Sequence, residues 1–204
     1  EAIASPATTN APVVLSNSTV AENVATETVV GVLSWLPQPD AAIPFMLVSG
    51  LGSADNSLFD IQGSNLLTKG SFDFEARTNF SIRVAAAYTN PNNLSFGAVL
   101  SVTVTDVNEP PSGVGLSRTA VFENEPPGTM VGGFFATDPD AGDTLAYSLT
   151  LGAPDNAFFN IVGTNLVTAV ALDHEVRNTY NIEVRAVDSG GLSCTSSLTV
   201  NVLN

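Results

Sequence analysis

Pairs of acidic residues separated by one position recur along this chain and could deliver two carboxylates to one point. The pairs are Asp73 with Glu75, Asp138 with Asp140, and Asp173 with Glu175. On extended chain, alternate side chains point to the same side, so both carboxylates of a pair can reach a single ion. Further oxygen-bearing side chains flank expected strands or occupy the middle of the chain: Glu22, Asp106, Asn108, Glu109 and Asp188.

Carboxylates gathered at one place need a cation between them. Two of them about 4 Å apart repel each other by roughly 1–4 kcal/mol, and a hard dication offsets that repulsion. Calcium takes about six to eight oxygen ligands from carboxylates, amide carbonyls and the backbone. Zinc and copper are poor candidates because the chain has 1 histidine and 1 cysteine. The sequence therefore predicts Ca²⁺ as the cofactor; the alternative is that these are solvated loop acids.

The elements that would position the acids are repeated. The chain aligns with itself at a period of about 100 residues, which is too long for a solenoid and suits tandem sandwich domains. Residues 55–66 match 155–166, and the alternating apolar residues of 80–86 match those of 180–186. Alternation with period two indicates half-buried strands, and no run of helical period stands out.

Short β-rich segments broken by Gly, Pro, Asn and Asp predict an all-β fold of two tandem immunoglobulin-like Greek-key β-sandwiches, with about seven strands each. The first copy has predicted strands at 13–15, 19–22, 28–35, 45–48, 58–61, 80–87 and 94–104. The second has them at 114–116, 119–123, 130–136, 144–150, 158–161, 179–187 and 192–203. We expect an N-terminal linker or tail at 1–11, repeat 1 at 12–105, a calcium-binding joint at 106–111 and repeat 2 at 112–204.

Composition narrows the function classes. The 204 residues include 20 Asp and Glu against 6 Lys and Arg, for a formal net charge of -14. A nucleic-acid partner would need a basic stripe, so none is expected. No apolar run reaches the length of about 18 residues that a membrane span needs, so no transmembrane segment is expected. An enzyme is not expected because the single histidine, His174, has no Gly-x-Ser-x-Gly nucleophile motif to serve.

Over residues 12–204 the motifs resemble those of the cadherin repeat. Glu22 with Asn23 is similar to that family's first-strand glutamate motif. Asp73-Phe74-Glu75 and Asp173-His174-Glu175 are similar to its Asp-x-Glu motif, and Asp138-Pro139-Asp140 to its Asp-x-Asp motif. Asp106-Val107-Asn108-Glu109 resembles its linker motif, and Asp188 with Gly190 its terminal aspartate motif. The residues in and around these motifs are more similar to divergent or microbial-type cadherin repeats than to vertebrate classical ones.

The resemblance implies three Ca²⁺ ions at the joint and divides the ligands among them. An outer ion would take Glu22, Asp73, Glu75 and Glu109. An inner ion would take Glu22, Glu75, Asp106, the Val107 carbonyl, Glu109 and Asp140. A third would take Asn108, Asp138, Asp140, Asp188 and the carbonyls of Pro110 and Gly142. Glu109 departs from the family, which usually has aspartate there, and its longer arm would bind differently or weaken the outer site.

Three of the acidic residues that repeat 2 is expected to contribute to the joint have no acidic counterparts in repeat 1. Asp138, Asp140 and Asp188 align with Pro37, Pro39 and Tyr88. A junction upstream of repeat 1 is therefore expected to bind no calcium. Repeat 2 keeps Glu123, Asp173 and Glu175, so a further repeat is expected after residue 204 in the natural protein.

Several functions remain open at this point. The resemblance implies an extracellular or cell-surface module that calcium stiffens into a rod segment, acting in cell adhesion through homophilic or heterophilic protein contacts. A carbohydrate-binding module with a surface glycan as its partner would need an exposed aromatic platform, and the aromatic residues fall mostly at core positions. The remaining alternative is a passive spacer repeat of a larger surface or secreted protein.

Overall fold

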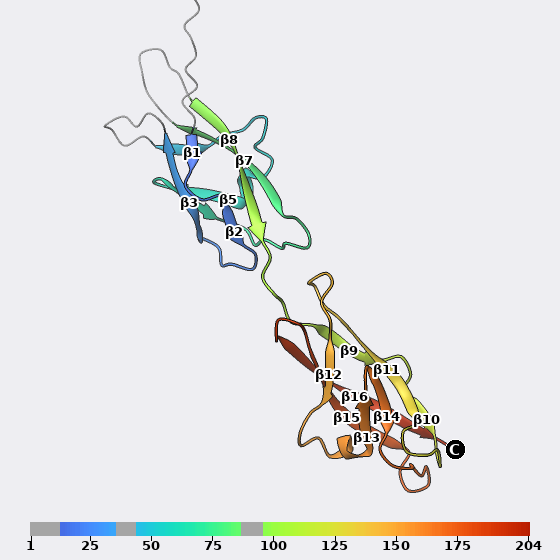
Figure 1. Cartoon of the computed structure of the whole chain (residues 1–204). Coiled ribbons are helices and arrows are strands. Elements are labelled where there is room, and N and C mark those ends of the chain that lie inside the picture. The colour runs from blue at the N-terminus through green and yellow to red at the C-terminus, as the bar shows by residue number, and fades with distance from the viewer. Residues whose placement is uncertain (1–12, 36–43, 87–95) are drawn as a thin grey trace, which may run out of the picture. The chain divides into compact units, whose positions relative to one another are not determined.

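The computed structural model describes residues 13–35, 44–86 and 96–204 (Figure 1). The chain divides into two compact units, Glu1–Val107 and Asn108–Asn204. Within the described residues each unit consists of two four-stranded sheets, which confirms the predicted all-β sandwich class. The expected linker or tail at 1–11, and the positions of Pro37, Pro39 and Tyr88, lie outside the described residues.

In the first unit one sheet has the strand order β1-β3-β6-β5 and the other has the order β2-β8-β7-β4. The strands are β1 (Val13–Leu15), β2 (Thr19–Ala21), β3 (Val29–Trp35), β4 (Phe45–Leu47), β5 (Phe59–Gln62), β6 (Asn65–Thr68), β7 (Asn79–Ala86) and β8 (Phe96–Thr105). A 3-10 turn, η1 (Asn56–Leu58), precedes β5.

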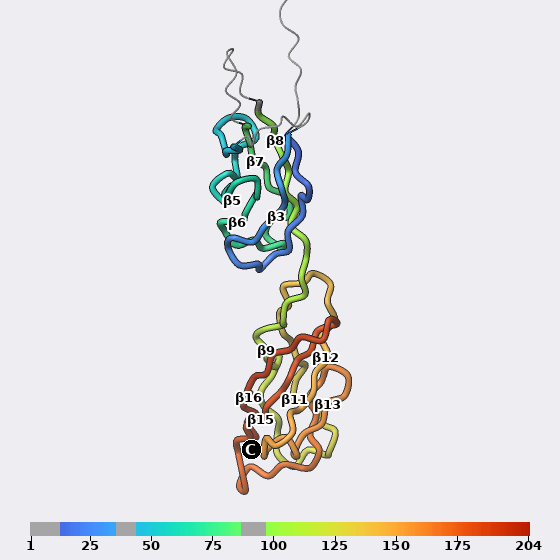
Figure 2. Tube along the Cα trace, turned by 90° about the vertical axis from the view of Figure 1, so that its left-hand side faces the viewer, coloured from blue at the N-terminus to red at the C-terminus, as the bar shows by residue number. Residues whose placement is uncertain are grey.

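The second unit repeats this topology with the sheets β13-β14-β11-β9 and β10-β16-β15-β12. The strands are β9 (Ser112–Leu116), β10 (Ala120–Phe122), β11 (Met130–Thr137), β12 (Ala146–Leu149), β13 (Phe159–Val162), β14 (Asn165–Thr168), β15 (Thr179–Val187) and β16 (Ser193–Leu203), with η2 (Pro154–Phe158) before β13. The long pair β15 and β16 runs side by side through the unit (Figure 2).

The first two strands of each sandwich belong to different sheets. β1 pairs antiparallel with β3, whereas β2 pairs parallel with β8. The crossing brings the backbone of Asn17 against Gly31, where an added Cβ would lie 2.4 Å from the Asn17 carbonyl oxygen. Gly132 meets the Arg118 carbonyl in the same way, at 2.5 Å. Only glycine fits so close to another backbone.

Each sandwich contains one strand that the sequence reasoning missed, β6 and its counterpart β14. β5 and β6 form a hairpin with Gln62 opposite Asn65, so the turn is the dipeptide Gly63-Ser64. Gly63 has φ 63°, a conformation that favours glycine. Leu66 and Leu67 are both buried, and this strand therefore lacks the alternation by which the others were predicted.

The two cores are built by the predicted alternation. On β7 the inward residues Phe80, Ile82, Val84 and Ala86 are all buried, as are Tyr180, Ile182, Val184 and Ala186 on β15. Each belongs to the hydrophobic cluster of its own unit. Burial of a large apolar side chain contributes about 1.5–3 kcal/mol, so these strands hold the loops at the ends of each sandwich in place.

Candidate metal centre

Three carboxylates of the first unit converge. Glu22, Asp73 and Glu75 each offer an oxygen, and the three oxygens lie within 4.8 Å of one another. Glu22 directly follows β2, and its N–H donates to the Thr105 carbonyl at 3.1 Å, so the parallel pair β2 and β8 is extended by one residue. Three of the predicted ligands of the first unit thus lie together at the end of β2.

The Glu22 side chain is 2% exposed and is held by two backbone groups. Its Oε1 accepts from the Val107 N–H at 2.9 Å and its Oε2 from the Phe74 N–H at 2.8 Å. Asn23, the next residue, has φ 55°, a left-handed conformation that asparagine tolerates better than most residues. The Asn23 N–H donates to the Phe72 carbonyl at 3.1 Å, so this turn is bonded to the residue before Asp73.

The Asp-x-Glu motif lies in a turn over residues 74–76 rather than on extended chain. Asp73 Oδ1 accepts from the Ala76 N–H at 2.8 Å, and the Asp73 carbonyl accepts from the Arg77 N–H at 3.0 Å. Asp138 and Asp140 also lie beyond a strand end, in a bend after β11. The assumption of extended chain was therefore wrong for both pairs, because Asp73 and Asp138 each accept a hydrogen bond from a backbone N–H two or three residues further along.

A second cluster belongs to the second unit and contains a residue that the sequence reasoning missed. Asp138, Asp140 and Asp143 offer oxygens within 4.8 Å of one another. Asp143 follows Gly142, which has φ 96° and for which only a carbonyl ligand was predicted. The presence of three acidic residues among the six residues 138–143 could have indicated that Asp143 belongs to the cluster. Ser189 Oγ donates to Asp143 Oδ1 at 2.6 Å and links this loop to the one after β15.

Asn108 and Glu109, which precede β9, make contacts to further acids of the second unit. Asn108 Nδ2 donates to Asp188 Oδ2 at 3.0 Å, and the Glu109 N–H donates to Asp140 Oδ2 at 2.7 Å. The Asp140 N–H in turn donates to Asp138 Oδ1 at 3.1 Å. The structure therefore brings Asn108 to Asp188 and the Glu109 backbone to the Asp-x-Asp pair.

The remaining predicted ligands of the joint lie between the end of β8 and the start of β9. Asp106 follows β8 and is exposed, Val107 is 43% exposed, and Pro110 is exposed two residues before β9. For Val107, Pro110 and Gly142 the predicted ligand was a main-chain carbonyl. The Val107 contact that the structure shows uses its N–H instead, which orients Glu22.

The second cluster has carboxylate oxygens without hydrogen-bond partners, and a bound cation would satisfy them. Asp138 Oδ2, Asp140 Oδ1 and Asp143 Oδ2 are buried and have no hydrogen-bond partner within the part of the chain that the structure describes. Burial raises the pKa of the Asp138 carboxyl, and the charges of Asp140, Asp143 and Asp188 raise it further. Buried, unpaired carboxylate oxygens are costly, and an all-oxygen donor set is what calcium prefers.

The second unit also reproduces the first cluster. Glu123, Asp173 and Glu175 offer oxygens within 4.8 Å, and the His174 N–H donates to Glu123 Oε2 at 3.1 Å, as the Phe74 N–H does to Glu22. Asn204 Nδ2 donates to Glu175 Oε1 at 3.0 Å. Both units therefore build the same arrangement from the same local sequence.

Comparison with known proteins yields one family. The family model for the cadherin domain matches residues 117–203. Cadherin-7 of Gallus gallus is 31% identical over 168 residues, which are 74% of this chain and 21% of that protein. Protocadherin Fat 4 of Homo sapiens is 28% identical over 200 residues, 95% of this chain and 4% of that protein. The chain thus spans about a fifth or less of the length of these relatives.

Solved structures agree in fold. PcdhgB3 EC1-4 has a TM-score of 0.67 at 25% sequence identity, over 95% of this chain and 50% of that one. Human Protocadherin-24 EC1-2 has a TM-score of 0.69 over 94% of this chain and 98% of that one, and at 17% identity it shows the fold alone.

Two sandwiches of one topology, each with a strand-end glutamate beside an Asp-x-Glu turn, define a tandem-repeat β-sandwich protein. The family match and the relatives make the assignment specific: the chain consists of cadherin repeats. Within the described residues, no helix combines the length and the apolar character that crossing a membrane requires.

Proposed function

We propose that this chain is an extracellular calcium-binding module in which Ca²⁺ ions stiffen the connection between two cadherin repeats. One observation carries the proposal. The Val107 N–H binds Glu22 of the first unit, and the side chain of the next residue, Asn108, binds Asp188 of the second. Neighbouring Cα atoms are about 3.8 Å apart, so acids of both repeats are tied to one short stretch of backbone.

The proposed ligand sets follow the sequence motifs. Glu22, Asp73, Glu75 and Glu109 would hold an outer ion, and Glu22, Glu75, Asp106, the Val107 carbonyl, Glu109 and Asp140 an inner one. Asn108, Asp138, Asp140, Asp188 and the carbonyls of Pro110 and Gly142 would hold a third. The convergence of Asp143 on Asp138 and Asp140 supports adding its carboxylate to that third set.

Calcium would act by relieving repulsion and by linking the two repeats. Extracellular calcium modules bind with dissociation constants of about 10⁻⁴–10⁻³ M. An ion at 100 times its dissociation constant stabilises the state that binds it by about 2.7 kcal/mol. Without the ions, the same carboxylates repel one another and the residues joining the units lose their common anchor.

The test combines binding, stability and shape. Isothermal titration of the chelator-treated chain with CaCl₂ is expected to give saturable binding, and thermal unfolding is expected to shift upward by about 10 °C or more at saturation. Small-angle scattering should show a narrower distribution of molecular dimensions with calcium than with EGTA. Titration with MgCl₂ is the control. Absence of binding heat together with an unchanged melting temperature would refute the proposal.

Adhesion at the cell surface is the broader role that we propose. The relatives are cadherins and protocadherins, and one similar solved structure is a protocadherin gammaB7 EC3-6 cis-dimer. A second copy of the chain is therefore the first partner to test. Beads coated with the chain should aggregate in calcium and disperse in EGTA. If the beads do not aggregate in calcium, homophilic contact is excluded, and a heterophilic contact or a passive spacer role remains.

The carbohydrate-binding alternative receives no support from the surface. Among the described side chains, the exposed aromatic ones are Phe122 and Phe135. Phe122 lies on β10 and Phe135 on β11, which belong to different sheets of the second unit. They form no common platform for a sugar ring, and a glycan array with no bound sugar is the expected result.

A further inference from the structure

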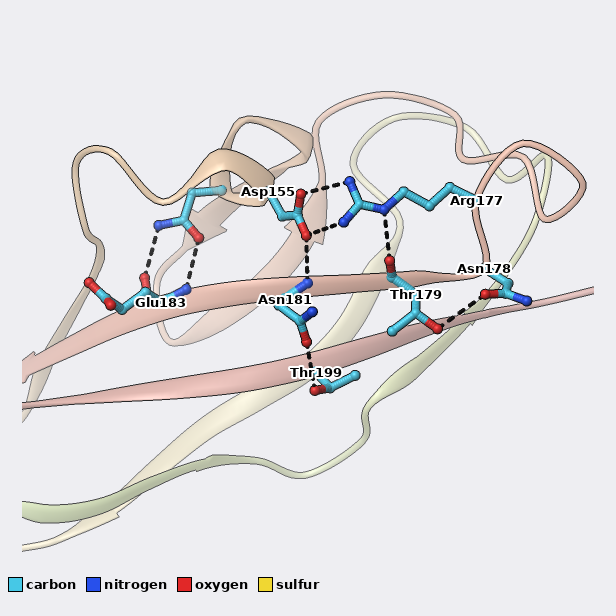
Figure 3. A network of polar contacts seen from close by, with 8 residues as sticks. Asp155, Arg177, Asn178, Thr179, Asn181, Glu183 and Thr199 are labelled. Atoms are coloured by element: carbon cyan, nitrogen blue, oxygen red, sulfur yellow. Dashed lines mark hydrogen bonds and ion pairs between the residues drawn. The ribbon is translucent and has the colours of Figure 1, made fainter.

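An ion pair between a buried aspartate and a half-exposed arginine recurs at matching positions in the two repeats. In the second unit Arg177 Nη1 donates to Asp155 Oδ1 at 2.7 Å, and its Nη2 donates to Oδ2, so the contact is two-pronged (Figure 3). The Asn181 N–H also donates to Asp155 Oδ2, at 2.7 Å. The guanidinium lies 4.6 Å from the ring centroid of Tyr180.

The first unit has the same network around Asp55, which is 5% exposed. Arg77 Nη1 and Nη2 donate to its two oxygens at 2.7 and 2.6 Å, and the Ser81 N–H donates at 2.7 Å. Arg77 stacks 4.4 Å from the ring centroid of Phe80. Neither Asp55 nor Arg77 belongs to the motifs that were predicted to bind calcium.

In each unit the arginine connects this network to the proposed calcium ligands. Arg77 closes the turn that begins at Asp73, through its N–H bond to the Asp73 carbonyl. Arg177 closes the matching turn at Asp173, at 2.9 Å. The end of each Asp-x-Glu turn is therefore fastened to a buried aspartate, which is itself fastened to β7 or β15.

We propose that Asp55 and Arg77 are positioning residues for calcium binding by Glu22, Asp73 and Glu75, and that Asp155 and Arg177 serve Glu123, Asp173 and Glu175 in the same way. The inference rests on the proposed function. The three carboxylates of each cluster repel one another in the absence of an ion. The two-pronged bond between arginine and aspartate holds the end of the turn in place and so keeps the three carboxylates close together. Calcium binding then requires less rearrangement of these side chains.

The two units allow a crossed experiment on the full chain. The amides of Phe74 and His174 report on one cluster each, because each donates to the glutamate of its own cluster. We would titrate ¹⁵N-labelled protein with CaCl₂ and follow both amide signals in the wild type, Asp55→Asn and Asp155→Asn. Asparagine keeps the size of the side chain and an acceptor for the backbone N–H.

Asp55→Asn is expected to raise the calcium midpoint of the Phe74 signal about tenfold, the lower end of the effect of losing a direct partner of a metal ligand, because Asp55 acts through Arg77. The His174 midpoint is expected to stay unchanged. Asp155→Asn is expected to leave the Phe74 midpoint unchanged. Leu33→Ala, which removes a core side chain of β3, controls for lost stability and should leave both midpoints unchanged.

The failures are distinguishable. A wild type whose Phe74 amide does not respond to calcium overturns both the proposed function and this inference. A responding wild type with the same Phe74 midpoint in Asp55→Asn overturns only the inference, as do equal shifts in Asp55→Asn and Leu33→Ala. If Asp55→Asn does not fold, Arg77→Lys replaces it, since it keeps the charge and loses the fork; an unchanged midpoint there overturns the inference.

Discussion

The side chain of Asn108 occupies the space that a Cβ atom on Gly190 would need. That atom would lie 2.1 Å from Asn108 Oδ1 and 2.7 Å from Nδ2. The same Nδ2 donates to Asp188 Oδ2 at 3.0 Å. Gly190 has no ligand atom in any proposed set, yet its missing side chain allows two proposed ligands to meet.

Gly190→Ala should therefore displace Asn108 and separate it from Asp188. A hydrogen bond to a charged group contributes about 1.5–3 kcal/mol, so the affinity of the proposed third calcium site, which includes both residues, should fall about tenfold or more. Isothermal titration would measure this change. Gly97→Ala is the matched control because the nearest atom to an added Cβ is 3.5 Å away. Equal affinities in both variants would contradict the role of Gly190.

Asp140→Ala should damage more than one site. Asp140 accepts the Glu109 N–H and lies within the cluster of Asp138 and Asp143, and it belongs to two proposed ligand sets. The number of ions bound per chain, measured by titration, should therefore fall by more than one. His174→Ala is the control, because the amide of His174 and not its side chain contacts Glu123. Loss of a single ion would show that the sites do not share Asp140.

Asp138→Asn should change calcium affinity and calcium-free stability in opposite directions. The pKa of Asp138 is raised by burial and by neighbouring carboxylates, so its favourable contribution is present at low pH and is lost as pH rises through the raised pKa. At neutral pH without calcium, the variant should gain about 1 kcal/mol in free energy of unfolding, the scale of one removed charge repulsion.

With calcium, the same variant loses a charged ligand and should bind about tenfold more weakly. Urea unfolding in EGTA and titration calorimetry would measure the two effects. The asparagine Oδ1 still accepts from the Asp140 N–H, so the local fold is retained. A variant that is less stable without calcium would show that these carboxylates do not repel one another.

The buried aspartates predict an acid-sensitive fold. The hydrogen bonds from Arg77, above all, hold the pKa of Asp55 below its ordinary value. Burial pushes the pKa of Asp155 upward, but the bonds from Arg177 and the Asn181 N–H outweigh it, so this pKa is also lowered. A lowered folded pKa gives stability that is complete above the ordinary value of about 3.9 and is lost as pH falls below it.

Calcium-free wild type and Asp155→Asn should therefore differ most in free energy of unfolding near pH 6 and converge below about pH 4. Urea unfolding followed by fluorescence or circular dichroism at each pH would show it. A difference that stays constant from pH 6 to pH 3 would mean that folding does not lower the pKa of Asp155.

The sequence was most informative where one physical signal dominated. Period-two alternation located β7 and β15, whose inward residues are buried as expected. The acids of the Asp-x-Glu motif were placed beside Glu22 by family resemblance, and the structure does bring them together. Their local geometry was not predictable from spacing, because Asp73 accepts a hydrogen bond from the Ala76 N–H and so closes a turn, whereas the spacing argument assumed extended chain.

Other features left no periodic signal. β6 has adjacent buried leucines, so its sequence does not alternate. Asp143 stands outside the motif that drew attention to Asp138 and Asp140, and only the folded loop shows that its carboxylate joins theirs. Asp55 and Arg77 are 22 positions apart, and a pairing at that separation depends on how η1 packs on β7.

The parallel strand pair at one edge of a sheet in each sandwich has a mechanical consequence. β2 lies along β8 in the first unit and β10 along β16 in the second, and each pair joins an early strand to the last one. Tension applied to the two ends of the chain draws such neighbours past each other along their length. Their hydrogen bonds must then fail as a group and not in succession, and stretching single molecules by atomic force microscopy would reveal abrupt rupture of each repeat.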